Sequence, residues 1–190
     1  PVLPDRVAGG GPTTSGVLIF GARQPDGRWA IFYEVHGGGE GATASKDGAS
    51  AVRVHMSNVM NTPTEVIEGD YPIMVEEHAL RPGSSGDGAH RGGLGFRRAY
   101  RILAPEVTLT SMLDRRVVPP YGLAGGRDGA PYRITLNPGP GERAIRGKET
   151  LKLAAGDLVL IETCGGGGYG PPAGRPADLR ARDRAEGYVP

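Results

Sequence analysis

Apolar and polar side chains alternate in the stretch Glu106-Val107-Thr108-Leu109-Thr110-Ser111-Met112-Leu113. A period of two is typical of a strand with one face on a core and the other on polar surroundings. One face carries Val107, Leu109, Ser111 and Leu113, and the other carries Thr108, Thr110 and Met112. The pattern therefore predicts a half-buried β-strand over residues 106–113.

Similar strand-like segments recur along the chain, and Gly, Pro, Asp and Asn residues separate them. They lie at 16–20, 28–35, 50–56, 71–80, 96–103, 106–113, 132–137, 149–153 and 157–163. Gln24-Pro25-Asp26-Gly27, between two of them, predicts a hairpin turn. Many short strands with turns between them predict a mostly β fold, a Gly-rich β-sandwich or barrel-like domain over residues 1–190.

Helix signals are few and lie in two places. Pro176 and Asp178 open a polar segment that Gly187 ends, which predicts a short C-terminal helix within the tail, residues 170–190. Thr62 stands three residues before Glu65, a spacing that fits a capping box. It predicts a second helix over residues 63–69, of barely two turns.

Glycine and proline are unusually frequent, at 33 Gly and 17 Pro in 190 residues. Such a composition would by itself indicate a disordered chain. The apolar runs at 17–20, 29–33 and 158–161 contradict this, because they bury enough surface to offset the entropy of the chain. We therefore interpret the glycines as turns and close backbone approaches in a folded domain.

The charges favour neither nucleic acid nor a membrane as a partner. The net charge is +1, and the basic residues are scattered apart from Arg97, Arg98 and Arg101, which we interpret as a solvated or partner-facing edge. The longest apolar runs are too short to cross a bilayer.

Cys164 is the one cysteine, so an internal disulfide is excluded and a reducing compartment, the cytoplasm, is expected.

Polar side chains with catalytic potential are concentrated just after the strand-like segment 50–56. His55, Asn58, Asn61 and Glu65 fall within eleven positions of one another. Amide groups could orient a small amide, and the imidazole or the carboxylate could move a proton. The alternative is that these are ordinary turn and cap residues.

Glu34 lies in the strand-like segment 28–35, and His36 directly follows this segment. Because the two residues are two positions apart, they should share one face of the strand. They could form an acid/base pair or contribute to a metal site, and ordinary polar packing explains them equally well. Two ligands without a third do not define a metal site, so no metal is assigned.

Two glycine clusters, at 91–95 and 164–170, look at first like phosphate-binding loops. Neither is followed by a Lys-Ser/Thr pair or by a clear helix, which such loops need. The sequence therefore predicts no nucleotide site on this chain, and the clusters are expected to shape crossings between strands. Nothing in the sequence marks Cys164 as a nucleophile, because reactivity requires a lowered pKa and a paired base.

Several short motifs follow one another along the chain. They are Gly37-Gly38-Gly39-Glu40-Gly41-Ala42, His55-Met56-Ser57-Asn58, Asn61-Thr62-Pro63-Thr64-Glu65, Asp70-Tyr71-Pro72, Arg91-Gly92-Gly93-Leu94-Gly95, Asp114-Arg115-Arg116, Pro119-Pro120-Tyr121-Gly122-Leu123, Asn137-Pro138-Gly139 and Gly165 through Gly170. Taken in order, these motifs resemble the C-terminal portion of the hydantoinase B/oxoprolinase family. Their shared order over nearly the entire chain makes the resemblance specific.

The resemblance implies an ATP-dependent amidohydrolase that opens a small cyclic amide, of the hydantoin or 5-oxoproline type. It implies an A-type ATPase subunit as partner, with ATP on that subunit, and the remaining N-terminal part of the B-type subunit, where a divalent metal outside this chain would be held. This chain alone is expected to be inactive, with His55, Asn58, Asn61 and Glu65 lining or bracing the substrate cavity. The alternatives are part of an ATP-dependent ketone carboxylase and a noncatalytic β scaffold for subunit assembly.

Overall fold

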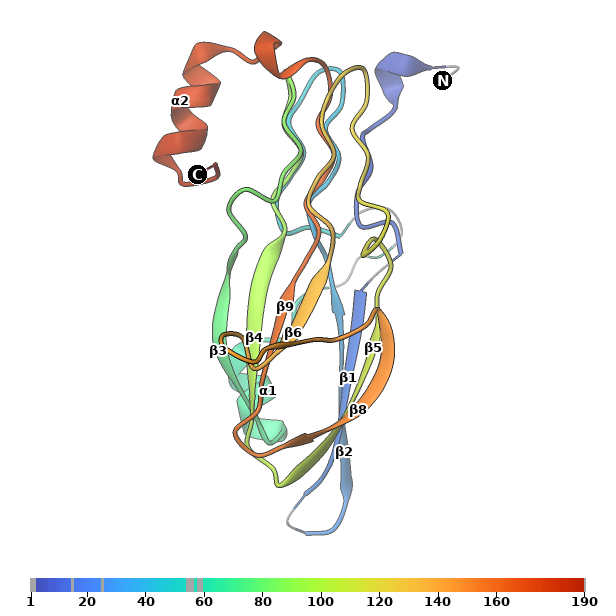
Figure 1. Ribbon diagram of the computed structural model, residues 1–190, viewed down its shortest axis with the longest axis vertical. Coiled ribbons are helices and arrows are strands. Elements are labelled where there is room, and N and C mark those ends of the chain that lie inside the picture. Colours follow the sequence, from blue (N-terminus) through green and yellow to red (C-terminus); the bar gives the residue numbers. More distant parts are fainter. Residues whose placement is uncertain (1–2, 15, 25, 54–56, 58–59, 190) are drawn as a thin grey trace.

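The computed structural model describes residues 3–14, 16–24, 26–53, 57 and 60–189, and shows two antiparallel sheets that face each other (Figure 1). The first sheet has the order β2-β1-β5-β8 and the second has the order β3-β4-β9-β6-β7. The strands of the first are β1 Gly16–Arg23, β2 Trp29–His36, β5 Glu106–Met112 and β8 Lys148–Ala154; those of the second are β3 Ile73–Leu80, β4 Phe96–Ile102, β6 Arg133–Leu136, β7 Arg143–Ala144 and β9 Leu158–Glu162. The predicted mostly β sandwich is thus confirmed, and the described strands do not close into a barrel.

The core lies between the two sheets. The inward side chains of β1 and β5, such as Phe20 and Leu109, are buried, as are Tyr100 of β4 and Ile161 of β9. The rings of Phe20 and Tyr100 lie 5.2 Å apart between centroids, which joins the sheets directly. Each large apolar side chain that is fully buried contributes about 1.5–3 kcal/mol, so this layer holds the sandwich together.

The local patterns predict most of the strands correctly. Along β5 the inward residues Val107, Leu109 and Ser111 are buried, as the alternation indicates. The hairpin between β1 and β2 is also confirmed, because the Gly27 N–H donates to the Gln24 carbonyl at 2.9 Å. Gly27 has φ of +85°, a conformation that glycine adopts without strain.

Two stretches differ from the predicted strands. Residues 50–53 contain no strand, and only an isolated bridge joins Val52 to Gly38, whereas 54–56 lie outside the described residues. The backbone of Val52 is hydrogen-bonded to Gly38, in a glycine-rich segment, and does not join a sheet. Strand β7 was not predicted, because two residues carry no period that sequence could show.

Both predicted helices are present, at slightly different bounds. Helix α1 covers Thr64–Asp70 and α2 covers Ala177–Ala185; short 3₁₀ turns lie at Pro4–Arg6 and Pro172–Gly174. The predicted capping box is wrong, because Pro63 is the N-cap and no side chain caps the helix. The Thr62 N–H donates instead to the Glu34 carboxylate at 3.0 Å. None of the described helices is both long and apolar enough to cross a bilayer.

Glycine-rich segments lie side by side as extended chains above the two sheets, where Figure 1 shows them as long traces. We call this region the glycine bundle; it comprises residues 9–11, 37–41, 86–95, 120–129 and 165–168. Backbone groups link the segments, for example the Gly166 N–H to the Gly93 carbonyl at 2.9 Å. A Cβ on Gly166 would lie 1.9 Å from the Glu40 carbonyl oxygen. The predicted close backbone approaches are therefore confirmed, although these clusters form extended segments and not turns.

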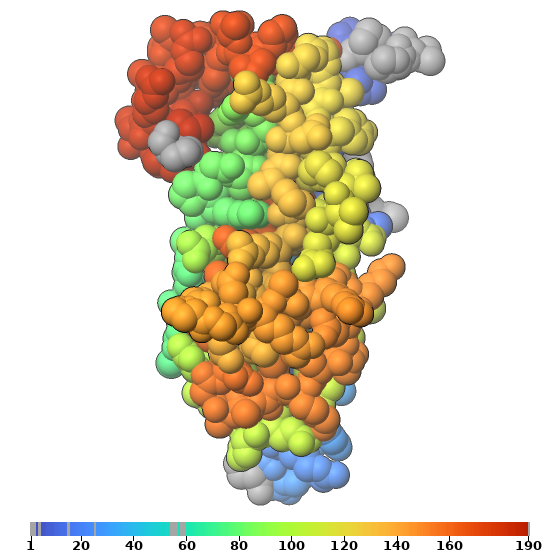
Figure 2. Space-filling model, viewed as in Figure 1, coloured from blue at the N-terminus to red at the C-terminus, as the bar shows by residue number. Residues whose placement is uncertain are grey.

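The C-terminal tail is fastened to the glycine bundle by ion pairs. Asp183 of α2 is buried between Arg91 and Arg175, at 3.1 and 2.7 Å, and Arg175 also pairs with Asp47 at 2.8 Å. In Figure 2 the tail forms the red lobe at the upper end of the molecule. Buried arginine–carboxylate bonds of this kind fix the position of a tail that has little apolar surface of its own.

Candidate functional site

A polar cluster lies buried between the sheets, at the end of the core that is nearest the glycine bundle. Glu34 and His36 come from β2, and Arg98 and Tyr100 come from β4. The Glu34 carboxylate accepts from Arg98 at 2.9 Å and from the Tyr100 hydroxyl at 3.1 Å, and His36 Nε2 lies 2.9 Å from that hydroxyl. The interpretation of the arginines as a solvated edge is therefore wrong for Arg98, which is 1% exposed on a central strand.

The surroundings of His36 keep its imidazole neutral. The His36 Nε2 atom forms a hydrogen bond with the Tyr100 hydroxyl, which is also bonded to Glu34. The His36 Nδ1 atom is also buried. Burial, and next the charge of Arg98, lowers the pKa of His36 to about 3, so the imidazole stays neutral.

Acidification is expected to destabilise the fold through His36. In the unfolded chain the pKa of the imidazole returns to its ordinary value of 6.5, whereas in the folded chain it is about 3. Between these values the unfolded state binds a proton that the folded state does not. This contribution to stability is therefore complete above pH 6.5 and falls by about 1.4 kcal/mol for each pH unit below it. Urea denaturation at a series of pH values measures the free energy of unfolding. Below pH 6.5 this free energy should fall less steeply with decreasing pH in His36→Asn than in the unmodified chain. An unchanged dependence on pH would contradict the lowered pKa of His36.

Glu34 and His36 share a buried face as predicted, but their surroundings favour a structural role over an acid/base one. Both are shut off from solvent, and the Glu34 charge is already paired with Arg98. Among the residues the structure describes, no three His, Cys, Asp or Glu side chains gather as metal ligands. We therefore interpret this cluster as a structural support for the chain segment that is bonded to it.

The neighbouring segment, residues 60–65, contains two of the predicted site residues, Asn61 and Glu65. Thr62 ties it to the cluster, because its N–H donates to Glu34 and its carbonyl accepts from Arg98 at 3.3 Å. The structure places Asn61 just before this anchor and Glu65 in the first turn of α1, and both are exposed. His55 and Asn58 lie outside the described residues. Asn61 and Glu65 thus stand on the surface over a rigid, buried support.

A cavity of about 650 Å³ opens along the glycine bundle. We call it the Glu40 cavity; it is lined by Val7, Ala8, Gly9, Gly10, Gly11, Thr13, Glu40, Gly41, Ala49, Val52, Arg53 and Tyr121. Arg53 is the last described residue before position 57, and its guanidinium donates to the Ser57 hydroxyl at 3.4 Å. Through this contact the wall of the cavity reaches Ser57, which stands between His55 and Asn58 in the sequence. Glu40 belongs to the glycine motif, and sequence reasoning did not select it as a site residue.

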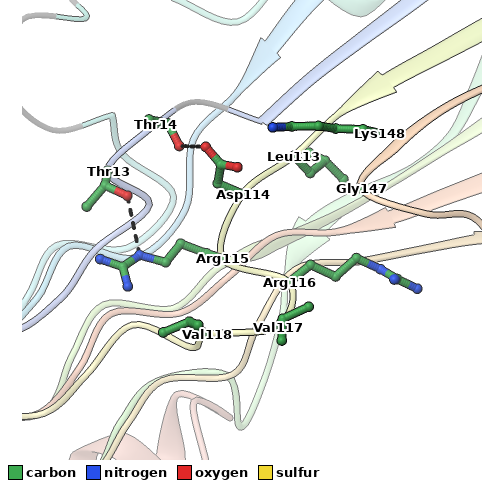
Figure 3. A pocket seen from close by; sticks show the side chains of 10 residues that line it. All are labelled: Thr13, Thr14, Leu113, Asp114, Arg115, Arg116, Val117, Val118, Gly147 and Lys148. Atoms are coloured by element: carbon green, nitrogen blue, oxygen red, sulfur yellow. Dashed lines mark hydrogen bonds between the residues drawn. The ribbon is translucent and has the colours of Figure 1, made fainter.

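A second cavity, of about 570 Å³, shares Thr13 with the first and is drawn in Figure 3. We call it the Arg115 cavity; it is lined by Thr13, Thr14, Leu113, Asp114, Arg115, Arg116, Val117, Val118, Gly147 and Lys148. The two are linked further because the Arg115 guanidinium lies over the Tyr121 ring, 5.7 Å from its centroid. The Asp114-Arg115-Arg116 motif lines this cavity, a role that its sequence alone did not reveal.

Cys164 is not placed to act as a nucleophile. It is buried below the glycine bundle, and burial raises the pKa of its thiol to about 12. A thiol in this state carries almost no thiolate near neutral pH, and the thiolate is the reactive form. The interpretation of Cys164 as unreactive is consistent with this environment.

Comparison with known proteins places the chain in a family. The family model described as hydantoinase B/oxoprolinase matches residues 1–172. An uncharacterized protein of Methanocaldococcus jannaschii, MJ0963, is 42% identical over 95% of this chain and 31% of its own length. The 5-oxoprolinase 1 of Arabidopsis thaliana is 40% identical over 73% of this chain and 11% of its own length.

A solved structure agrees with these matches. The ATP-dependent caprolactamase of Pseudomonas jessenii has a TM-score of 0.84 and 26% identity, over 98% of this chain and 34% of its own. The chain therefore spans about a third of the length of MJ0963 and of the caprolactamase chain, and about a tenth of the plant enzyme. With a family model that matches nearly the whole chain, and a two-sheet fold shared with the caprolactamase, the chain belongs to the hydantoinase B/oxoprolinase family.

Proposed function

We propose that the chain is the C-terminal part of a B-type subunit in an ATP-dependent amidohydrolase that opens a cyclic amide of the hydantoin or 5-oxoproline type. Support comes from the family model and from relatives that are named as a 5-oxoprolinase and a caprolactamase. These relatives act on cyclic amides according to their names, which favours a hydrolase over the ketone carboxylase and the noncatalytic scaffold.

The observation that carries this proposal is the Glu40 cavity, because its wall residue Arg53 bonds to Ser57, within the polar sequence stretch that runs from His55 to Glu65. Its volume suits a small organic molecule. Amide side chains such as Asn61 can donate to and accept from a cyclic amide, and Glu65 can move a proton to or from water. His55 and Asn58 belong to the same proposed set.

ATP is assigned to a partner of the A type and not to this chain. The glycine segments do not form open loops, because other backbone already fills the space beside them: a Cβ on Gly39 would lie 1.9 Å from the Gly93 carbonyl oxygen. A phosphate group has no room at such a contact. The proposed assembly therefore combines this chain, the rest of the B-type subunit and an ATPase subunit.

Replacing Asn61 or Glu65 by Ala in the complete complex is expected to reduce turnover of the cyclic amide. If Glu65 moves a proton, the loss of kcat should be about 100-fold or more, and the loss of a positioning amide should be smaller. The measurement is amide-dependent phosphate release by the assembled complex. Glu186→Ala, an exposed carboxylate next to α2, is the matched control. Unchanged turnover in Asn61→Ala and Glu65→Ala would refute their role.

The scaffold alternative has a separate test. If residues 1–190 form part of the site, their removal from the complex should abolish cyclic-amide turnover while the remaining subunits still associate. Native mass spectrometry measures the association, and phosphate release measures the coupling. Dissociated subunits that retain the chemistry would favour a scaffold.

A further inference from the structure

We infer that the Arg115 cavity binds a small organic oxyanion, with a carboxylate or phosphoryl group against its cations and an apolar body against its valines. The inference rests on the proposed function only for the source of that anion. In an amide-opening enzyme the source is either a carboxylate on the ring or its product, or a phosphoryl group on an activated substrate. The anion site itself is argued from the cavity.

The cavity is built where the backbone is held from several sides. It lies between the end of β5 and the start of β8, with Thr13 and Thr14 across from them (Figure 3). The Leu113 N–H donates to the Gly147 carbonyl at 2.6 Å, and the Tyr132 N–H donates to the Arg115 carbonyl at 3.0 Å. These bonds fix the backbone that carries the cations, so the site is preformed.

Two residues of the wall have backbone conformations that side chains rarely adopt. Arg115 has φ of +52° and Thr13 has φ of +55°. They come from distant parts of the chain, and the Arg115 guanidinium donates to the Thr13 hydroxyl at 3.3 Å. Strain in non-glycine residues costs about 1–3 kcal/mol each and tends to occur at functional sites. Two such residues in contact at one cavity therefore point to a function for it.

The charges of the wall are unbalanced in favour of cations. Arg115, Arg116 and Lys148 face one carboxylate, Asp114, which already accepts a hydrogen bond from Thr14. Within the described part of the chain, neither the Arg116 guanidinium nor the Lys148 ammonium has a hydrogen-bond or ion-pair partner. In contrast, carboxylates pair with Arg81, Arg91, Arg97, Arg98, Arg101, Arg133, Arg143 and Arg175.

The direction of the side chains spreads this charge around the cavity. In Figure 3 the Arg115 guanidinium points towards Thr13, whereas the Arg116 guanidinium points the opposite way. The guanidinium groups of the two arginines therefore lie apart and do not converge on one point. A concave wall with three cations and one carboxylate has a net positive charge and concentrates anions, so an anion is favoured and a metal cation is not.

The same cavity offers apolar surface to the rest of the ligand. Val117 and Val118 line it and are 88% and 64% exposed, and Leu113, which also lines it, is buried. Exposed valines beside cations fit an organic anion better than a bare inorganic one, because the apolar body would cover them. The volume of about 570 Å³ also suits a small molecule.

The test measures binding of three small ligands to the 190-residue chain by isothermal titration calorimetry at low salt. They are 5-oxoproline, which carries a carboxylate, methyl phosphate, which carries a phosphoryl group, and uncharged caprolactam. The double variant Arg116→Gln/Lys148→Gln should bind the anions at least about tenfold more weakly. The control Lys46→Gln/Arg182→Gln removes the same charge from exposed positions outside the cavity and should bind normally. Unchanged thermal unfolding midpoints show that both variants fold.

Stronger binding of 5-oxoproline identifies a carboxylate as the source of the anion, and stronger binding of methyl phosphate identifies a phosphoryl group. The inference is overturned if caprolactam binds as tightly as the anions, if neither anion binds, or if the double variant binds them as the control does. Cyclic-amide turnover by the assembled complex tests the proposed function independently, so each idea can fail without the other.

Discussion

Gly166→Ala is expected to lower the free energy of unfolding by about 3 kcal/mol or more, or to prevent folding altogether. The new Cβ would lie 1.9 Å from the Glu40 carbonyl oxygen and 2.4 Å from its carbon, and both are backbone atoms. Backbone cannot rotate aside as a flexible side chain can. Insertion of even one carbon into a packed interior typically costs about 1–3 kcal/mol, and a rigid neighbour places the cost at or above the upper end. Urea denaturation of the purified chain measures the change.

Gly69→Ala is the matched control for this substitution. Gly69 lies in α1, and a Cβ there would meet no heavy atom within 4 Å. Alanine is preferred over glycine in a helix by about 1 kcal/mol, so stability should stay the same or rise. Equal effects at Gly69 and Gly166 would show that the close approach in the glycine bundle is not what requires glycine.

The strands could be predicted from sequence because their signal is local. In β5 the alternation of buried Val107 and Leu109 with Thr108 and Thr110 is set by the geometry of one strand. The glycine bundle could not be predicted in this way. Gly166 contacts Glu40 and Gly93, which are distant in sequence, and glycine has no side chain whose period could reveal such neighbours.

The candidate site could be predicted only in part for a similar reason. The shared face of Glu34 and His36 follows from their spacing, but their partners Arg98 and Tyr100 belong to the opposite sheet. Arginine is seldom fully buried, which favoured an exposed interpretation of Arg98. The missed signal is that Arg98 shares the parity of Tyr100 and Ile102, the buried face of β4.

Arg98→Ala is expected to destabilise the chain by about 3–5 kcal/mol, since it leaves the Glu34 carboxylate buried without its cation. Glu34 is 4% exposed, so water cannot replace the guanidinium. The Thr62 carbonyl loses a donor as well. Arg101→Ala is the matched control on the same strand: Arg101 pairs with Glu76 at 2.8 Å near the surface, where such a pair is worth at most about 1 kcal/mol. Urea denaturation compares the two.

The double variant Arg98→Ala/Glu34→Gln separates the lost cation from the lost volume. Glutamine removes the uncompensated charge. Its one amide oxygen can still accept from Thr62, and its NH2 group can donate to the Tyr100 hydroxyl oxygen, so the double variant should be more stable than Arg98→Ala alone. If Arg98→Ala costs no more than Arg101→Ala, or if Glu34→Gln restores nothing, the buried pair does not support the fold as argued.

Because Thr62 is held by both partners, loss of the pair should also release the segment that contains Asn61 and Glu65. Hydrogen exchange of the Thr62 amide, faster in Arg98→Ala than in Arg101→Ala, would show that the core controls the position of the proposed site residues.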